Sequence, residues 1–188
     1  MKHLRYWYWP NVFSKNQIIE LNNFIDNNYD SIETDKTQAS NPTGQNKKQA
    51  NTKLITLGKL APYVNHCLDQ AYLASARAYG YNVYPRNGLD TFLHAVYSDK
   101  DSGKYDFHYD GSRSDVYDVK LSFIINLSLK PYEGGKFKIF NNDEYEIEKF
   151  TKPGSAILFK SYLNHRVTPV TKGERRSLTT FLCGPKFR

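Results

Sequence analysis

Two histidines and an aspartate have the types and the spacing of a metal site. His108 and Asp110 are separated by one residue in a strand-like segment, and His165 follows much later. Residues i and i+2 of a strand point to the same face, so the first imidazole and the carboxylate can converge on one ion. A third ligand from a distant strand would complete the facial triad of two histidines and one carboxylate that non-haem Fe(II) sites use. The His108-x-Asp110 pair or His165 taken alone would more often be structural, so the interpretation depends on the residues around them.

A candidate anion-binding residue follows the second histidine. Arg175 and Ser177 are separated by one residue, and the Lys172-Gly173 turn predicts a hairpin between His165 and Arg175. On such a hairpin both side chains can face one cavity, where the guanidinium could bind a remote carboxylate bidentately with help from the serine. The alternative is an exposed hairpin charge, which is our interpretation of Arg176, because it points the opposite way.

The first half of the chain predicts helices that support these residues. Leu4–Trp9 is typical of a strand, and a capping box at Ser14-x-x-Gln17 opens a helix. A second helix is expected over Lys59–Tyr79, ending at Gly80. The polar residues 30–52 between these helices predict a long loop, followed by a short strand over Lys53–Leu57.

The second half predicts short strands separated by turns, and therefore a double-sheet β fold with N-terminal helices. Alternation along the first of these strands puts His94 out of phase with Tyr97, so we expect His94 on the outer face. The strands are expected at Thr91–Tyr97, Tyr105–Asp110, Val119–Leu129, Lys136–Phe140, Ser155–Lys160, His165–Val170 and Ser177–Cys183.

Composition narrows the possible classes of protein. The chain has 188 residues with 15% aromatic residues, which is enough for one folded domain over 1–188. We find no run of eighteen apolar residues and no secretory signal pattern, and the two cysteines, Cys67 and Cys183, form no disulfide framework. These features indicate a cytoplasmic protein that does not span a membrane.

The formal charge is +7, and the excess lies mainly between Lys149 and Arg188, where nine basic residues accompany one acid. This basic 149–188 segment could attract nucleic acid. An ordinary solvated surface is the favoured alternative, because no nucleic-acid-binding motif accompanies it.

The order of the motifs resembles the Fe(II)- and 2-oxoglutarate-dependent dioxygenases, in particular their prolyl 4-hydroxylase-like branch with the bacterial PKHD-type hydroxylases. The resemblance covers about Thr91 to Cys183. The matching stretches are Tyr97 with Tyr105-x-x-His108-x-Asp110, YEGGKFKI at 132–139, KPGSAILF at 152–159 and HRVTPVTKGERRS at 165–177. It implies a double-stranded β-helix, the cupin-like jelly roll, over 91–188, with 1–90 supplying the N-terminal strand and supporting helices.

The resemblance also implies roles for the site residues. His108, Asp110 and His165 would bind iron, and Arg175 would pair with the C5 carboxylate of 2-oxoglutarate. Three further residues would help to bind this cosubstrate: Ser177, Tyr97 and Asn126. Dioxygen would be the second cosubstrate, and ascorbate is a further candidate cofactor of this branch.

The expected reaction is hydroxylation of a C–H bond with release of succinate and CO2. The substrate would be a protein, peptide or amino acid, most plausibly a peptidyl or free prolyl residue. Two alternatives stay open at this point. The first is an oxygenase of the same chemistry that demethylates or hydroxylates nucleic acid, and the second is a non-catalytic jelly-roll binding protein. Residues 30–52 and 111–118 could be lids over the substrate or ordinary surface loops.

Overall fold

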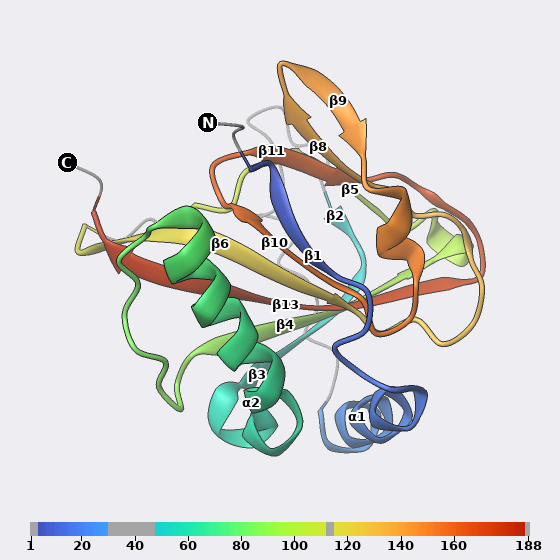
Figure 1. The fold of residues 1–188 in the computed structure, drawn as a ribbon. Coiled ribbons are helices and arrows are strands. Elements are labelled where there is room, and N and C mark those ends of the chain that lie inside the picture. Colours follow the sequence, from blue (N-terminus) through green and yellow to red (C-terminus); the bar gives the residue numbers. More distant parts are fainter. Residues whose placement is uncertain (1–3, 30–47, 112–114, 187–188) are drawn as a thin grey trace.

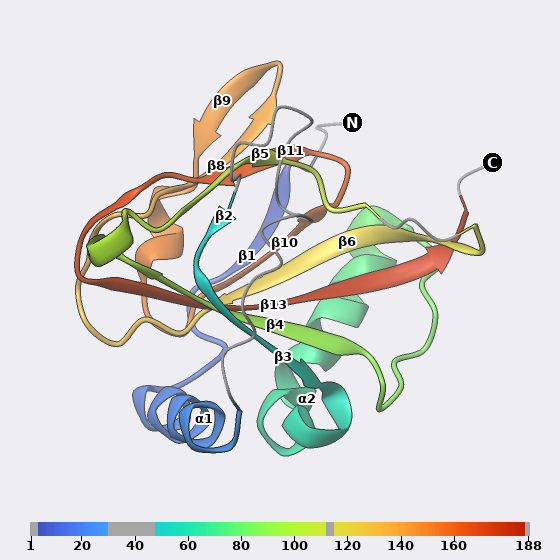
Figure 2. The same cartoon turned by 180° about the vertical axis from the view of Figure 1, so that it is seen from behind.

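The computed structural model describes residues 4–29, 48–111 and 115–186, which form two antiparallel β-sheets with two helices on one side (Figures 1 and 2). The six-stranded sheet has the order β1-β10-β6-β13-β4-β3 and the five-stranded sheet the order β2-β5-β11-β8-β9. All of their pairings are antiparallel. The arrangement is that of a jelly roll, and the predicted fold class, mainly β with N-terminal helices, is confirmed.

The strands of the six-stranded sheet come from both halves of the chain. They are β1 Tyr6–Trp9, β10 Ala156–Lys160, β6 Tyr117–Asn126, β13 Glu174–Pro185, β4 Thr91–Ser98 and β3 Asn51–Thr56. The five-stranded sheet consists of β2 Lys48–Gln49, β5 Lys104–His108, β11 Asn164–Val167, β8 Phe137–Asn141 and β9 Asp143–Glu146. A short pair, β12 Val170–Lys172 and β7 Glu133–Gly134, lies beside them. Strands from before residue 91 therefore extend both sheets of the second half.

Both predicted helices form close to their expected bounds. The first, α1 Lys15–Asn28, opens with the predicted capping box, in which the backbone N–H of Gln17 donates to Ser14 Oγ at 3.3 Å. The second, α2 Leu57–Ala74, continues as a π-helical turn over Ser75–Tyr79 and ends at Gly80 in the left-handed conformation. None of the described helices has the length and apolarity needed to cross a bilayer.

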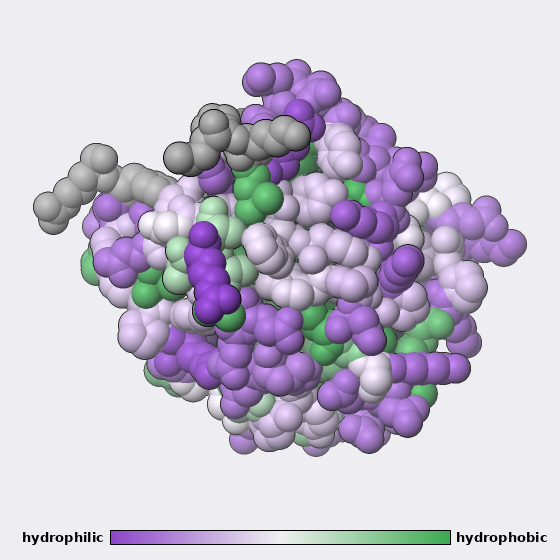
Figure 3. All heavy atoms as spheres, viewed as in Figure 1, coloured by the Kyte–Doolittle hydropathy of each residue, from purple (hydrophilic) through white to green (hydrophobic). Residues whose placement is uncertain are grey.

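Two apolar cores lie on opposite faces of the six-stranded sheet. Along β6, Phe123 and Ile125 pack toward the helices, whereas Ile124 packs between the two sheets. The alternation of side chains along a strand explains this division. On the face seen in Figure 3, most of the surface is hydrophilic and apolar side chains form small separate patches.

The predicted loop over 30–52 is wrong at its C-terminal end. Residues 30–47 lie outside the described residues, but Lys48–Gln49 pairs with β5 and Asn51–Thr56 pairs with β4. These polar segments carry little hydrophobic signal, and pairing with strands distant in sequence makes them β. The second segment that we considered as a lid, 111–118, is described except for residues 112–114.

Several other strand boundaries differ from the predictions. The strand expected over Val119–Leu129 runs over Tyr117–Asn126, and the one expected over His165–Val170 is divided into β11 and β12. The strand expected over Tyr105–Asp110 ends at His108, and the last strand begins at Glu174 rather than Ser177. The earlier start of β13 follows from its long pairing with β4, in which Arg175 stands opposite Tyr97.

His94 corrects a prediction about exposure. It faces away from Tyr97 as the alternation predicts, but its side chain is completely buried on the helix-covered face. Neither ring nitrogen has a hydrogen-bond partner among the described residues. Burial lowers the pKa of His94 to about 4, with Arg176 and Lys53 lowering it and Asp26 raising it.

We therefore expect His94 to make the protein sensitive to acid. The unfolded chain, in which the pKa is near its ordinary 6.5, takes up the proton first as the pH falls. The free energy of unfolding should decrease between about pH 6.5 and pH 4, by up to about 3 kcal/mol for this group. Urea denaturation should show a smaller loss in His94→Leu than in the natural protein, while the exposed His66→Gln serves as a control. Identical pH profiles for the His94 variant and the natural protein would contradict this origin.

Candidate active site

The structure brings together the three residues predicted to bind a metal. His165 on β11 stands directly opposite His108 at the end of β5. Asp110 follows two residues later, where its backbone N–H donates to the carbonyl of Ser161 at 2.9 Å. Asp110 Oδ1 lies 3.7 Å from His108 Nε2, and Oδ2 lies 3.4 Å from His165 Nε2. One potential ligand atom from each residue lies within 4.8 Å of the other two.

Both imidazoles present the nitrogen that a metal needs. His108 Nδ1 lies 2.8 Å from the carbonyl oxygen of Asp106, and His165 Nδ1 lies 2.9 Å from that of Leu163. A carbonyl oxygen only accepts hydrogen bonds, so each Nδ1 must carry the proton. In the neutral ring Nε2 then carries the lone pair that can bind a metal, and in both histidines Nε2 is the nitrogen near Asp110.

Ser122 orients the carboxylate of the cluster. Its hydroxyl, buried on β6, donates to Asp110 Oδ2 at 2.6 Å. Sequence reasoning did not assign Ser122 a role. The available signal was a serine at an inward-facing position in an otherwise apolar run of strand residues.

This donor set fits a divalent first-row metal such as Fe(II). Imidazole nitrogen and carboxylate oxygen bind such ions at roughly 2.0–2.2 Å, which puts neighbouring ligand atoms about 3 Å apart. The observed separations of 3.4 and 3.7 Å need only small side-chain adjustments. Three ligands also leave other coordination positions for small molecules.

A cavity of about 100 Å³ lies beside the cluster, between the two sheets, and Arg175 lines it. The Arg175 side chain is only 2% exposed, and its Nη1 donates to Ser177 Oγ at 3.3 Å. No carboxylate of the described residues lies within ion-pairing distance of it. A Cβ atom added at Gly135 would lie 3.1 Å from Arg175 Cδ, so the absence of a side chain at this glycine leaves room for the arginine. A buried cation without an anion is costly, and the cavity is therefore suited to an anionic ligand.

Tyr97 lies next to this arginine, as the pairing of β4 with β13 requires. Its ring centroid is 5.4 Å from Arg175 Cζ, and its side chain lines the cavity. Burial raises the pKa of Tyr97 to about 12, although Arg175 acts to lower it. The hydroxyl therefore stays protonated and can donate a hydrogen bond to a ligand.

Asn126 is placed differently from its predicted role. Its amide nitrogen donates to the carbonyl of Phe150 at 3.0 Å, and its amide oxygen accepts from the backbone N–H of Ser128 at 2.9 Å. It does not line the cavity. Because both ends of the amide have backbone partners, we leave Asn126 out of the candidate binding site.

Sequence reasoning also missed Lys48, which lines the same cavity. The residue is 8% exposed, and its Nζ lies 5.2 Å from the ring centroid of Tyr105. Burial lowers the pKa of Lys48 to about 8, and the charge of Asp110 opposes this effect. No signal along the sequence separated this lysine from the polar residues around it.

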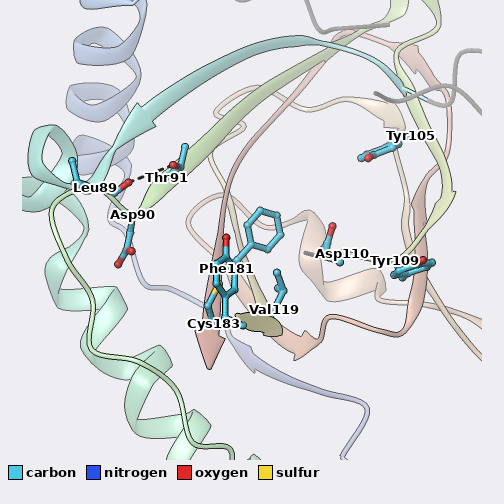
Figure 4. Close-up of a pocket in the computed structure, with 11 residues that line it drawn as sticks. Leu89, Asp90, Thr91, Tyr105, Tyr109, Asp110, Val119, Phe181 and Cys183 are labelled. Carbon is cyan, nitrogen blue, oxygen red and sulfur yellow. Dashed lines mark hydrogen bonds between the residues drawn. The ribbon is translucent and has the colours of Figure 1, made fainter. Parts of the chain in front are cut away.

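An open cleft of about 580 Å³ reaches Asp110 of the cluster (Figure 4). Tyr105, Asp110 and Phe181 line both the cleft and the cavity, so the two spaces adjoin each other. Tyr109 and Tyr117 also line the cleft, and Tyr109 is 65% exposed. The carboxylate of Asp110, a candidate metal ligand, thus lines a cleft that also presents aromatic rings.

The basic 149–188 segment is partly neutralised in the fold. Arg166 pairs with Glu144 at 2.7 Å, Lys172 with Glu133 at 3.2 Å, and Arg176 with Asp26 at 2.7 Å. Arg175 is buried in the cavity. The local excess of positive charge in the sequence is therefore reduced by acids from other segments.

Comparisons with known proteins agree with this geometry. The model of the 2OG-Fe(II) oxygenase superfamily matches residues 92–183, and no curated protein sequence matches the chain. The structure of a Pseudomonas putida prolyl-4-hydroxylase has a TM-score of 0.70 at 18% identity, covering 98% of this chain and 95% of that one. A viral collagen prolyl hydroxylase from Paramecium bursaria Chlorella virus-1 has a TM-score of 0.69 at 16% identity, covering 96% and 97%.

The same fold also occurs in a non-haem α-ketoglutarate-dependent carbocyclase, SnoK from nogalamycin biosynthesis. Its TM-score is 0.65 at 10% identity, covering 97% of this chain and 81% of that one. Similarity at these identities shows the fold alone. The superfamily match spans the His108–Asp110–His165 cluster and Arg175, and it agrees with the resemblance in the motifs. Residues 92–183 therefore belong to the 2OG-Fe(II) oxygenase superfamily, and the chain has a fold like that of the prolyl 4-hydroxylases.

Proposed function

We propose that this protein hydroxylates a C–H bond of a prolyl residue, either peptidyl or free. In the balanced reaction, the substrate, 2-oxoglutarate and O2 yield the hydroxylated substrate, succinate and CO2. The observation that carries the proposal is the convergence of His108, Asp110 and His165 beside a buried cation, Arg175, in one cavity.

Each residue of the cavity has a distinct task in this proposal. His108, Asp110 and His165 hold Fe(II), which with 2-oxoglutarate and O2 supplies the oxidising chemistry when bound. Arg175 binds the C5 carboxylate of 2-oxoglutarate, and Ser177 assists it. We assign this role to Arg175 because of its charge. Pairing a buried guanidinium with a carboxylate offsets the free-energy cost of burying each of the two charges.

The surrounding fold keeps water away from the reacting groups. His165 and Arg175 are buried, and apolar side chains such as Ile124 and Phe137 form the walls of the cavity. Tyr97 lines the cavity, and its protonated hydroxyl can donate a hydrogen bond to the cosubstrate. Asp110 lines the open cleft, so the substrate would approach the metal from there.

Two observations support a prolyl substrate. The cleft presents Tyr105, Tyr109, Tyr117 and Phe181, and grooves lined with aromatic rings favour proline, whose ring packs against them. Two of the solved structures with this fold are prolyl hydroxylases. The nucleic-acid alternative has less support, because the basic segment that suggested it is partly paired with acids.

The first test is formation of succinate. The natural protein, supplied with Fe(II), ascorbate as reductant, 2-oxoglutarate and a panel of proline-containing peptides and free amino acids, should release succinate. His108→Ala should reduce this turnover at least about 100-fold, because it removes a metal ligand. His66→Ala, an exposed histidine of α2, should behave as the natural protein does. Equal turnover in the natural protein and His108→Ala would refute the assignment.

A second test separates the cosubstrate site from the metal site. Arg175→Ala should weaken binding of 2-oxoglutarate by about 2–5 kcal/mol, the usual cost of truncating one partner of a buried charge pair. Iron binding should be preserved. Arg176→Ala is the matched control, since this neighbour pairs with Asp26 on the other face. Calorimetry under nitrogen would measure both affinities, and loss of iron with unchanged 2-oxoglutarate affinity would show that the role is wrong.

A third test concerns the orientation of Asp110. Ser122→Ala removes the hydroxyl that donates to Oδ2, and we expect iron affinity to fall about 10- to 100-fold, as for other residues that support metal ligands. Ser128→Ala is the control, because that hydroxyl bonds only to the backbone of Arg176. Iron affinities measured by competition with a chelator should rank the variants, and equal values for both serine variants would exclude this role.

A further inference from the structure

Lys48 is the one buried lysine of the described residues whose charge has no acidic partner. Three lysines are buried in this part of the chain: Lys48, Lys53 and Lys120. Lys53 lies 3.4 Å from Asp26, and Lys120 lies 3.5 Å from Asp118. No carboxylate of the described residues lies within 4 Å of Lys48 Nζ, and the ring of Tyr105 is the neighbour of its charge.

The lysine lines the cavity beside the three candidate metal ligands. Lys48 lies on β2 and pairs with Tyr105 on β5, whose ring its ammonium group approaches. Tyr105 lines both the cavity and the open cleft and stacks on His108 with ring centroids 3.5 Å apart. Arg175, in contrast, comes from the other sheet. Two cations from different sheets therefore line one small cavity.

The charges already assigned in the cavity balance without this lysine. Bound Fe(II) contributes two positive charges and Arg175 one, whereas Asp110 contributes one negative charge and 2-oxoglutarate two. Lys48 adds a positive charge that none of these groups neutralises. An uncompensated buried cation is destabilising, so a further anion in the cavity would be bound favourably. The lowered pKa of about 8 still leaves the lysine mostly protonated at neutral pH.

We propose that Lys48 binds a carboxylate of the substrate, so that the substrate is a free amino acid or a C-terminal residue rather than an internal residue of a peptide. This inference rests on the proposed function and chooses between its two forms, free and peptidyl. The α-carboxylate of such a substrate would supply the missing negative charge beside Tyr105. The aromatic side chains of the cleft would contact its ring.

The test compares ligands that have this carboxylate with ligands that lack it. Calorimetry under nitrogen, on protein loaded with Fe(II) and 2-oxoglutarate, would measure the affinities of L-proline, L-prolinamide and a proline peptide with blocked ends. In the natural protein L-proline should bind at least about tenfold more tightly than the other two, as expected for a buried charge pair. Lys48→Met, which keeps the aliphatic stem, should abolish this preference, and Lys48→Arg should retain most of it.

Lys104→Met is the matched control, because this neighbouring lysine on β5 pairs with Asp106 instead of lining the cavity. It should keep the preference for the acid. The inference is overturned if L-prolinamide or the blocked peptide binds the natural protein as tightly as L-proline does, or if Lys48→Met keeps the preference. It is also overturned if Lys48→Met mainly weakens 2-oxoglutarate binding, which would make the lysine a cosubstrate residue.

These outcomes are distinct from failure of the prolyl proposal. If the blocked peptide is bound and hydroxylated independently of Lys48, the enzyme is a prolyl hydroxylase and the inference is wrong. If no prolyl compound binds, the prolyl proposal is wrong, and the same measurement with other free amino acids and their amides decides the role of Lys48. A preference for the acids that is lost in Lys48→Met would support the inference, and the absence of such a preference would overturn it.

Discussion

The pairing of β5 with β11 is the constraint on which the candidate site depends. It sets His108 opposite His165 and so joins candidate metal ligands that are far apart in sequence. The register matters because a shift of one residue would turn one imidazole to the other face of the sheet. Hydrogen bonds from each Nδ1 to a backbone carbonyl then fix the rings, and Ser122 fixes the carboxylate. The cluster is thus organised by the fold before any ion binds.

Unbalanced charge is the second organising feature. On the helix-covered face the buried Lys53 is compensated, since Asp26 lies beside both this lysine and Arg176. Between the sheets, Arg175 and Lys48 have no acidic partner within ion-pairing distance among the described residues. A fold that pairs charges elsewhere but leaves two cations around one cavity gives up some stability there and gains affinity for anions. Binding of a dicarboxylic acid and a substrate carboxylate would restore the balance.

The local elements and the main site residues could be predicted from the sequence. Capping at Ser14, the helical periodicity after Lys59 and the succession of short strands are local signals, so both helices and the overall class agree with expectation. The short β2 and the early start of β13 could not be predicted, because polar residues become strands there only through distant partners. The prediction that His94 lies on an outer face was wrong for a similar reason, since periodicity assigns a residue to a face of the sheet but does not show what covers that face.

The sequence by itself determined which chemical groups are available: two imidazoles, a carboxylate and an arginine, in an order that matches a known superfamily. Only the tertiary structure decided which of the other polar residues join them. It placed Lys48 and Ser122 in the site and directed the amide of Asn126 to backbone partners outside it. The physical reason is that residue type and strand alternation are local properties. Which residues line the same cavity depends instead on the register of the sheets and on the chain segments that cover the cavity.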